Sequence, residues 1–244
     1  MSTLLEILKS AAGTPLVSKG GVREEFKLLP PLTLDELQEL EAKIPCPLPA
    51  EMRDVFAITR GFECGELGLV DFAGLPGGFG LEEVCPHALS IAGDDCGNFW
   101  VVDLTSESRA WGPIYYACHD APVFVYQTDS LFHFIQEALR GEIEPWKSEI
   151  WDVPGKFSDQ IWRANPGVLC YKECANSSDV ELREFAKTLD PTYEFVDLRF
   201  PRLGDGFSWG RYGRRFVVKR FSKKRIFANQ INKSSWQKFK DALK

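Results

Sequence analysis

The sequence has few of the residues and patterns on which catalysis and nucleotide binding commonly depend. Its 244 residues include only 3 histidines, and none follows His133. Neither the Rossmann pattern of strand, G-x-G-x-x-G and helix nor the Walker pattern ending in G-K-[S/T] is present. These absences exclude most histidine-dependent nuclease chemistry from residues 145–244 and both nucleotide-binding motifs from the chain.

Long apolar runs and a disulfide framework are also missing. No run approaches the ~20 apolar residues that cross a bilayer, and the N-terminal S-T-L-L-E-I-L-K-S is too short and interrupted for a signal peptide. The 7 cysteines are odd in number and scattered, unlike those of a secreted disulfide-rich domain. Hydrophobic residues make up 44% of the chain, which predicts a packed core. We therefore expect a cytoplasmic protein without a transmembrane segment.

The residues that could perform chemistry do not form a recognisable set. Cys85 and His87 are one close pair, whereas structural zinc sites usually contain two. Cys118, His119 and Asp120 are contiguous, but neighbours on an extended chain point to opposite faces, so their adjacency does not make a triad. The sequence thus predicts no enzyme, no metal site and no cofactor.

Charge is distributed unevenly along the chain. Residues 1–144 contain 9 Lys/Arg and 23 Asp/Glu, whereas residues 145–244 contain 20 Lys/Arg and 12 Asp/Glu. An acidic part followed by a basic part predicts either two units that dock on each other or two surfaces with different partners.

Helix and turn signals divide the first part of the chain. Thr33 and Glu36 have the spacing of a capping box for a helix that stops before Pro45. A second helix is predicted over residues 50–60, with Gly61 at the left-handed position that follows it. We interpret residues 61–90 as loops and residues 99–102, 113–117 and 123–127 as strands. A closing helix is predicted that Ser130 caps and that ends before Gly141.

A domain boundary is predicted near residues 144–146. The resulting units are a helix and linker over 1–31, an α+β domain over 32–144 and a basic α+β domain over 145–244. In the last unit, Ser178 and Glu181 have capping-box spacing for a helix that ends before Pro191. The remaining predicted elements are strands at 193–200 and 215–221 and a helix at 234–243.

Residues ~32–140 resemble the SUKH superfamily, which includes the Smi/Knr-type cell-wall synthesis regulators and many bacterial toxin-immunity proteins. The resemblance rests on L-T-L-D-E-L-Q-E-L-E, L-P-A-E-M-R-D-V-F-A-I-T-R-G, G-D-D-C-G-N-F-W-V-V-D-L, W-G-P-I-Y-Y and S-L-F-H-F-I-Q-E-A-L in this order. Two departures are Arg60-Gly61-Phe62 after the second helix and the long glycine-rich loop that follows it.

The resemblance implies an α+β fold in which a twisted antiparallel sheet is flanked by helices. It also implies binding in place of catalysis, because bacterial members commonly neutralise a toxin, often a nuclease, and fungal members act as interaction hubs. The resemblance does not extend to residues 145–244, where an additional α+β region is expected.

The predicted partner-binding site is an acidic face. It consists of acidic residues in the strand-turn region and in the loop before it: Asp94, Asp95, Asp103, Glu63, Glu66 and Asp71. Such a face would meet a basic protein, for example a nuclease surface that grips phosphates. The alternative interpretation is that these acidic loops only keep the protein soluble.

A second candidate surface lies in the basic part. Its cations alternate with aromatic residues, as in grooves that bind single-stranded nucleic acid, and they are Arg211, Arg214, Arg215, Lys219 and Arg220. Other interpretations are a solvated strand face, docking on the acidic domain, and binding to acidic lipid. The favoured hypothesis is a non-catalytic protein-binding module of the toxin-immunity or regulatory kind, and the alternative is a nucleic-acid-associated adaptor. The sequence does not indicate an oligomeric state.

Overall fold

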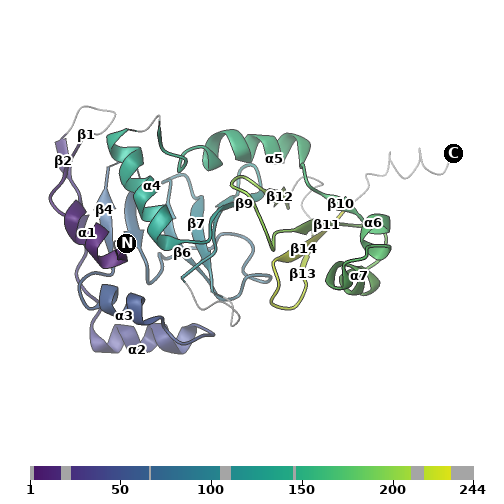
Figure 1. Cartoon of the computed structure of the whole chain (residues 1–244), viewed down its shortest axis with the longest axis horizontal. Coiled ribbons are helices and arrows are strands. Elements are labelled where there is room, and N and C mark those ends of the chain that lie inside the picture. Colours follow the sequence, from purple (N-terminus) through teal and green to yellow (C-terminus); the bar gives the residue numbers. More distant parts are fainter. Residues whose placement is uncertain are drawn as a thin grey trace.

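The computed structural model describes residues 3–17, 23–65, 67–104, 111–144, 147–209 and 217–231. Within these ranges the predicted α+β class is confirmed, because helices flank an eight-stranded antiparallel sheet and a smaller α+β region follows (Figure 1). The strands of the large sheet, in chain order, are β3 (Lys27–Leu28), β4 (Gly61–Cys64), β5 (Gly68–Asp71), β6 (Ala88–Gly93), β7 (Phe99–Asp103), β8 (Ile114–Cys118), β9 (Val123–Thr128) and β12 (Gly206–Ser208).

Spatial order in the large sheet is β12-β9-β8-β7-β6-β5-β4-β3. A four-stranded sheet has the order β10-β11-β14-β13, and its strands are β10 (Leu169–Cys170), β11 (Tyr193–Asp197), β13 (Val218–Arg220) and β14 (Ile226–Gln230). Near the N-terminus, β1 (Pro15–Val17) pairs with β2 (Arg23–Glu25). The N-terminal residues thus join the sheet region through β1, β2 and β3, where the sequence predicted a linker.

Helices pack against both sheets (Figure 1). α1 and α4 lie across the large sheet, while α6 and α7 lie beside the small one. The helices are α1 (Leu4–Ala11), α2 (Leu34–Lys43), α3 (Ala50–Phe56), α4 (Leu131–Ile143), α5 (Ser158–Ala164), α6 (Tyr171–Ala175) and α7 (Val180–Lys187), with a π-helical turn at Val153–Phe157 before α5. No helix in the described ranges is long and apolar enough to cross a membrane.

Two predicted helix starts are confirmed by their hydrogen bonds. At α2 the Glu36 amide donates to Thr33 Oγ1 at 3.2 Å, and the Thr33 amide donates to Glu36 Oε2 at 2.8 Å. At α4 the His133 amide donates to the Ser130 hydroxyl at 3.2 Å. Each side chain satisfies an amide that the first turn of a helix leaves without an intrahelical acceptor.

Other boundaries differ from the prediction. α3 ends at Phe56, and Gly61 lies in β4, where an added Cβ would stand 1.9 Å from the Val70 carbonyl oxygen. Gly61 is therefore required by close strand packing and not by a left-handed turn. α4 continues past Gly141 to Ile143, and Asp179 caps α7 in place of Ser178.

The glycine-rich stretch 61–90 contains strands that the sequence did not reveal. β4 and β5 form a hairpin, and β6 begins at Ala88. Their short length and frequent glycines obscure the two-residue alternation by which strands are recognised. β12, three residues long and beginning at Gly206, was missed for the same reason. β14 was also missed although it is five residues long, and the predicted helix at 234–243 lies outside the described residues.

Apolar side chains cover both faces of the large sheet. One face packs against α1, α3 and α4. The other carries Tyr115 and Phe124, and Phe124 lies 5.8 Å from Phe207 and 6.1 Å from Phe227 between ring centroids. Residues on the two sides of the predicted boundary near 144–146 thus share one apolar core.

Candidate partner-binding surface

Asp94 organises the turn between β6 and β7. Its carboxylate accepts hydrogen bonds from the Cys96 amide at 3.0 Å, from the Asn98 amide at 3.1 Å and from the Tyr116 hydroxyl at 2.9 Å. Partial burial opposes ionisation, but the Asn98 side chain and these donors outweigh it and hold the pKa of Asp94 below its usual value. Asp94 is therefore occupied within the turn, whereas Asp95 is exposed at its tip with a φ of 58°.

Asp71, at the end of β5, is also occupied inside the protein. Its carboxylate accepts from Arg60 Nε at 2.8 Å and from the Ala73 amide at 2.9 Å. Burial raises the pKa of Asp71 despite the lowering effects of the Ala73 amide and the Arg60 guanidinium. Asp71 thus anchors the chain after β5 and does not face solvent.

Asp103 and Arg220, predicted for two different surfaces, form an ion pair with each other. Arg220 Nη2 lies 2.7 Å and Nη1 3.2 Å from the two oxygens of Asp103, and the side chains are 6% and 2% exposed for Arg220 and Asp103. Burial alone would lower the pKa of Arg220, but the Asp103 carboxylate raises it above its usual value. In this structure neither group is available to an external partner.

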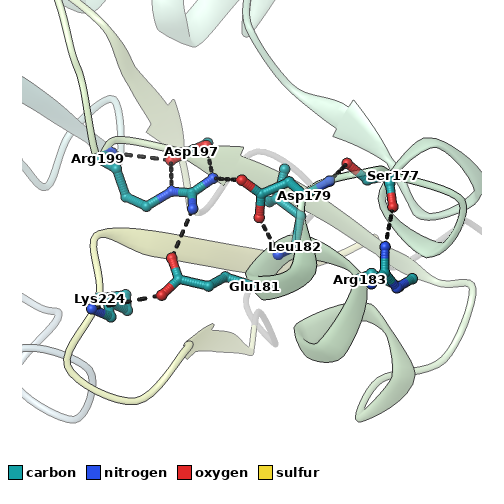
Figure 2. Close-up of polar contacts among 8 residues, drawn as sticks. All are labelled: Ser177, Asp179, Glu181, Leu182, Arg183, Asp197, Arg199 and Lys224. Carbon is teal, nitrogen blue, oxygen red and sulfur yellow. Dashed lines mark hydrogen bonds and ion pairs between the residues drawn. The ribbon is translucent and has the colours of Figure 1, made fainter.

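Further arginines of the basic part pair with carboxylates. Arg225 Nη1 lies 2.6 Å from Asp129. Figure 2 shows Arg199 surrounded by Asp197, Asp179 and Glu181, at 2.6, 2.8 and 2.7 Å. These pairs agree with the docking interpretation of the charge asymmetry, because Arg220 and Arg225 contact carboxylates of the acidic part.

The remaining predicted basic residues divide into two groups. Lys219 is exposed on β13. Arg211, Arg214 and Arg215 lie outside the described residues, as does Glu66 of the predicted acidic face.

Glu63 occupies the exposed face of the sheet end formed by β3, β4 and β5. Its cross-strand neighbours are Lys27 on β3 and Leu69 on β5, and all three side chains are exposed. They border a groove of about 820 Å³ that Glu25 also lines. We refer to Glu25, Lys27, Glu63 and Leu69 as the sheet-end surface.

Sequence reasoning identified Glu63 but missed the rest of the sheet-end surface. Glu25 and Lys27 belong to β2 and β3, in a segment that was predicted to be a linker. The alternation R-E-E-F-K-L, with Phe26 1% exposed between exposed Glu25 and Lys27, is the signal that could have revealed this strand.

The cysteine and histidine candidates lie in different environments. Cys118 is 8% exposed on β8, and burial raises the pKa of its thiol, which disfavours the nucleophilic thiolate. His119 is half exposed, with Nδ1 3.0 Å from Asn98 Oδ1. Within the part of the chain that the structure describes, no group of three or more His, Cys, Asp or Glu side chains could hold a metal ion.

Comparison with known protein families gives a match for one segment of the chain. Residues 31–137 match the model of the SMI1/KNR4 family (SUKH-1). The matched segment runs from the residues before α2 to the middle of α4, so it contains most of the large sheet. Comparisons with curated proteins and with solved structures gave no match.

Proposed function

We propose that the chain binds one protein partner, in a toxin-immunity or regulatory role, through the sheet-end surface, because residues 31–137 match the SMI1/KNR4 (SUKH-1) family model. The family supports a role of this kind, and the acidic character of the surface specifies a basic partner. In the immunity case, the partner would be a toxin such as a nuclease whose phosphate-binding face is occluded.

The observation that carries this proposal is the pairing of exposed carboxylates with an apolar side chain at one groove. Glu25 and Glu63 line the groove, and Leu69 is 43% exposed beside them. An apolar contact rimmed by charge is the usual composition of a protein interface. Asp71, Asp94 and Asp103 offer no comparable surface, because each is held by groups of this chain.

The position of the groove also favours this end of the sheet. One face of the large sheet is covered by α1, α3 and α4, and the other is covered over β7, β8, β9 and β12 by residues of the C-terminal region. The sheet-end surface lies on β2–β5, and β3 is the edge of the large sheet farthest from β12. A partner could therefore bind there without displacing any part of the core.

The charges of the sheet-end surface would chiefly affect which protein binds and how fast it associates. Two carboxylates near one groove attract a basic protein, raise its association rate and disfavour acidic competitors. Lys27 is the cross-strand partner of Glu63 and lines the same groove as Glu25, so it would give the partner a position for one acidic group. This mixed pattern would fix the orientation of the complex.

The test uses the full chain as bait in a native lysate treated with nuclease. The wild type is compared with the double variant Glu25→Lys/Glu63→Lys and with the matched control Glu39→Lys/Asp54→Lys, which reverses two exposed charges on α2 and α3. We expect the wild type and the control to retain one protein in equimolar amount, which is then purified for titration. The Glu25/Glu63 variant should bind it at least about tenfold more weakly, because two like charges then face a basic surface.

Two results would contradict the proposal. One is equal retention of the partner by the Glu25/Glu63 variant, which would move the site elsewhere on the protein. The other is a wild type that retains nothing from the nuclease-treated lysate but retains material when the nuclease is omitted, which would favour the nucleic-acid adaptor.

A further inference from the structure

Phe200 is the most exposed large apolar side chain among the described residues. It is 92% exposed and lies between β11 and β12. Phenylalanine is usually buried, because removing its ring from water is favourable. A single exposed ring is common on protein surfaces, so the meaning of this one depends on the groups around it.

The backbone before Phe200 is fixed by Arg199. The guanidinium of Arg199 bonds to Asp197, Asp179 and Glu181, and its amide donates to Asp197 Oδ1 at 3.0 Å (Figure 2). Only 18% of the Arg199 side chain is exposed. This network ties the segment to β11 and to the first turn of α7.

The backbone after Phe200 is fixed to β9. The Arg202 amide donates to Asp205 Oδ2 at 2.8 Å, and the Asp205 carbonyl accepts from the Tyr126 amide at 2.8 Å. The Gly204 amide donates to the Tyr126 carbonyl at 3.0 Å. With both flanks anchored, the ring is presented in one place, which lowers the ordering cost of binding.

Residues that follow Phe200 in the same loop line a groove. Its volume is about 320 Å³, and its apolar lining comes from Phe157, Pro166 and Leu203. Arg202 and Asp205 line it as well. Their side chains form an ion pair at 3.5 Å and are 89% and 37% exposed, so both charges lie at the surface beside the groove.

We propose that this surface binds a second copy of the chain, with Phe200 of each copy entering the groove of the other across a two-fold axis. A two-fold contact requires a patch that is complementary to itself. This loop meets the requirement, because it carries a projecting ring, an apolar groove, a cation and an anion within residues 200–205. Arg202 of one copy would then face Asp205 of the other.

This dimer is independent of the sheet-end surface. Phe200 belongs to the loop that leads into β12, at one edge of the large sheet, whereas β3 forms the opposite edge. A dimer formed here would therefore leave both sheet-end surfaces available, and the chain would present two partner sites.

The test is sedimentation velocity on the full chain over about 1 µM to 1 mM, a range that spans weak to moderate affinities. The variant is Phe200→Ala, and the control is Leu34→Ala, which removes another exposed side chain (78%) from α2. We expect the wild type and Leu34→Ala to form a dimer with the same dissociation constant. Phe200→Ala should weaken dimerisation at least about tenfold, as expected for loss of an aromatic anchor.

A wild type that stays monomeric over the whole range would overturn the proposal, and so would a dimer that Phe200→Ala leaves unchanged. Loss of a different captured protein by Phe200→Ala, with no dimer in the wild type, would assign the ring to another partner and also overturn it. The Glu25/Glu63 double variant should dimerise normally, so failure of the partner-binding proposal would be seen separately.

Discussion

Replacing Arg220 with methionine tests whether the buried ion pair joins the two parts of the chain. Arg220 lies on β13 and Asp103 at the end of β7, and more than nine-tenths of each side chain is buried. Methionine retains an unbranched apolar side chain, so the main loss is the guanidinium. The variant leaves the Asp103 carboxylate buried beside no cation and removes the bond from Arg220 Nε to the Lys224 carbonyl at 2.8 Å.

The expected effect on stability is large because water cannot replace the missing partner. Removing one member of a buried pair destabilises a protein by about 3–5 kcal/mol, a substantial share of a total near 5–15 kcal/mol. In urea this lowers the unfolding midpoint by about 1–2 M. The double variant Asp103→Leu/Arg220→Met, which leaves no unpaired charge, should recover most of the loss.

Equilibrium urea unfolding, followed by tryptophan fluorescence, provides the measurement. Arg163→Ala serves as the control, because Arg163 and Asp159 approach to 2.6 Å but are 75% and 57% exposed. An exposed pair contributes about 0–1 kcal/mol. If Arg220→Met cost less than about 1 kcal/mol, the reasoning that this buried pair fastens β13 to the large sheet would be refuted.

Three further predictions concern the turn, the strand packing and the thiols. Asp94→Asn should lower the free energy of unfolding by about 1–3 kcal/mol at neutral pH. The pKa of Asp94 lies below its usual 3.8, so its stabilising effect is present above that pH and is lost as the pH falls through the folded-state value. In urea titrations, the difference in unfolding free energy between wild type and variant should therefore shrink below about pH 4. Gly61→Ala should reduce the melting temperature, whereas Gly155→Ala, whose Cβ meets nothing within 4 Å, should not; equal melting temperatures would contradict the packing at Val70. Iodoacetamide should label exposed Cys96 and Cys170 quickly in the native protein and the buried cysteines only after unfolding. Mass spectrometry of the peptides gives the order of labelling, and labelling of a buried cysteine before these two would contradict the structure.

Local signals in the sequence predicted the elements whose structure depends on neighbouring residues. The Thr33–Glu36 spacing identified the start of α2, and short continuous apolar runs bounded by turn residues located β7, β8 and β9. The same kind of signal was too weak for β4, β5 and β12, which are three or four residues long and contain glycine. β4 and β12 also pair with strands distant in the sequence, β3 and β9, and composition does not report such partners.

For the candidate site as well, the sequence showed which residues are acidic but not which of them pair with distant residues. Acidic composition drew attention to six residues, of which Glu63 and Asp95 are exposed and Asp71, Asp94 and Asp103 are engaged within the protein. The sequence could not separate these groups, because the arginine that pairs with Asp103 lies 117 positions away.

The sequence by itself determined the α+β class, the capped helices, the resemblance of residues ~32–140 to the SUKH superfamily and the separation of charge along the chain. These properties are visible in the composition and in the spacing of residues that are close together in the sequence. Only the tertiary structure decided that much of this charge is neutralised internally and that Glu63 shares a groove with Glu25. Burial and long-range pairing determine which charged groups remain in water, and both depend on how distant segments pack together.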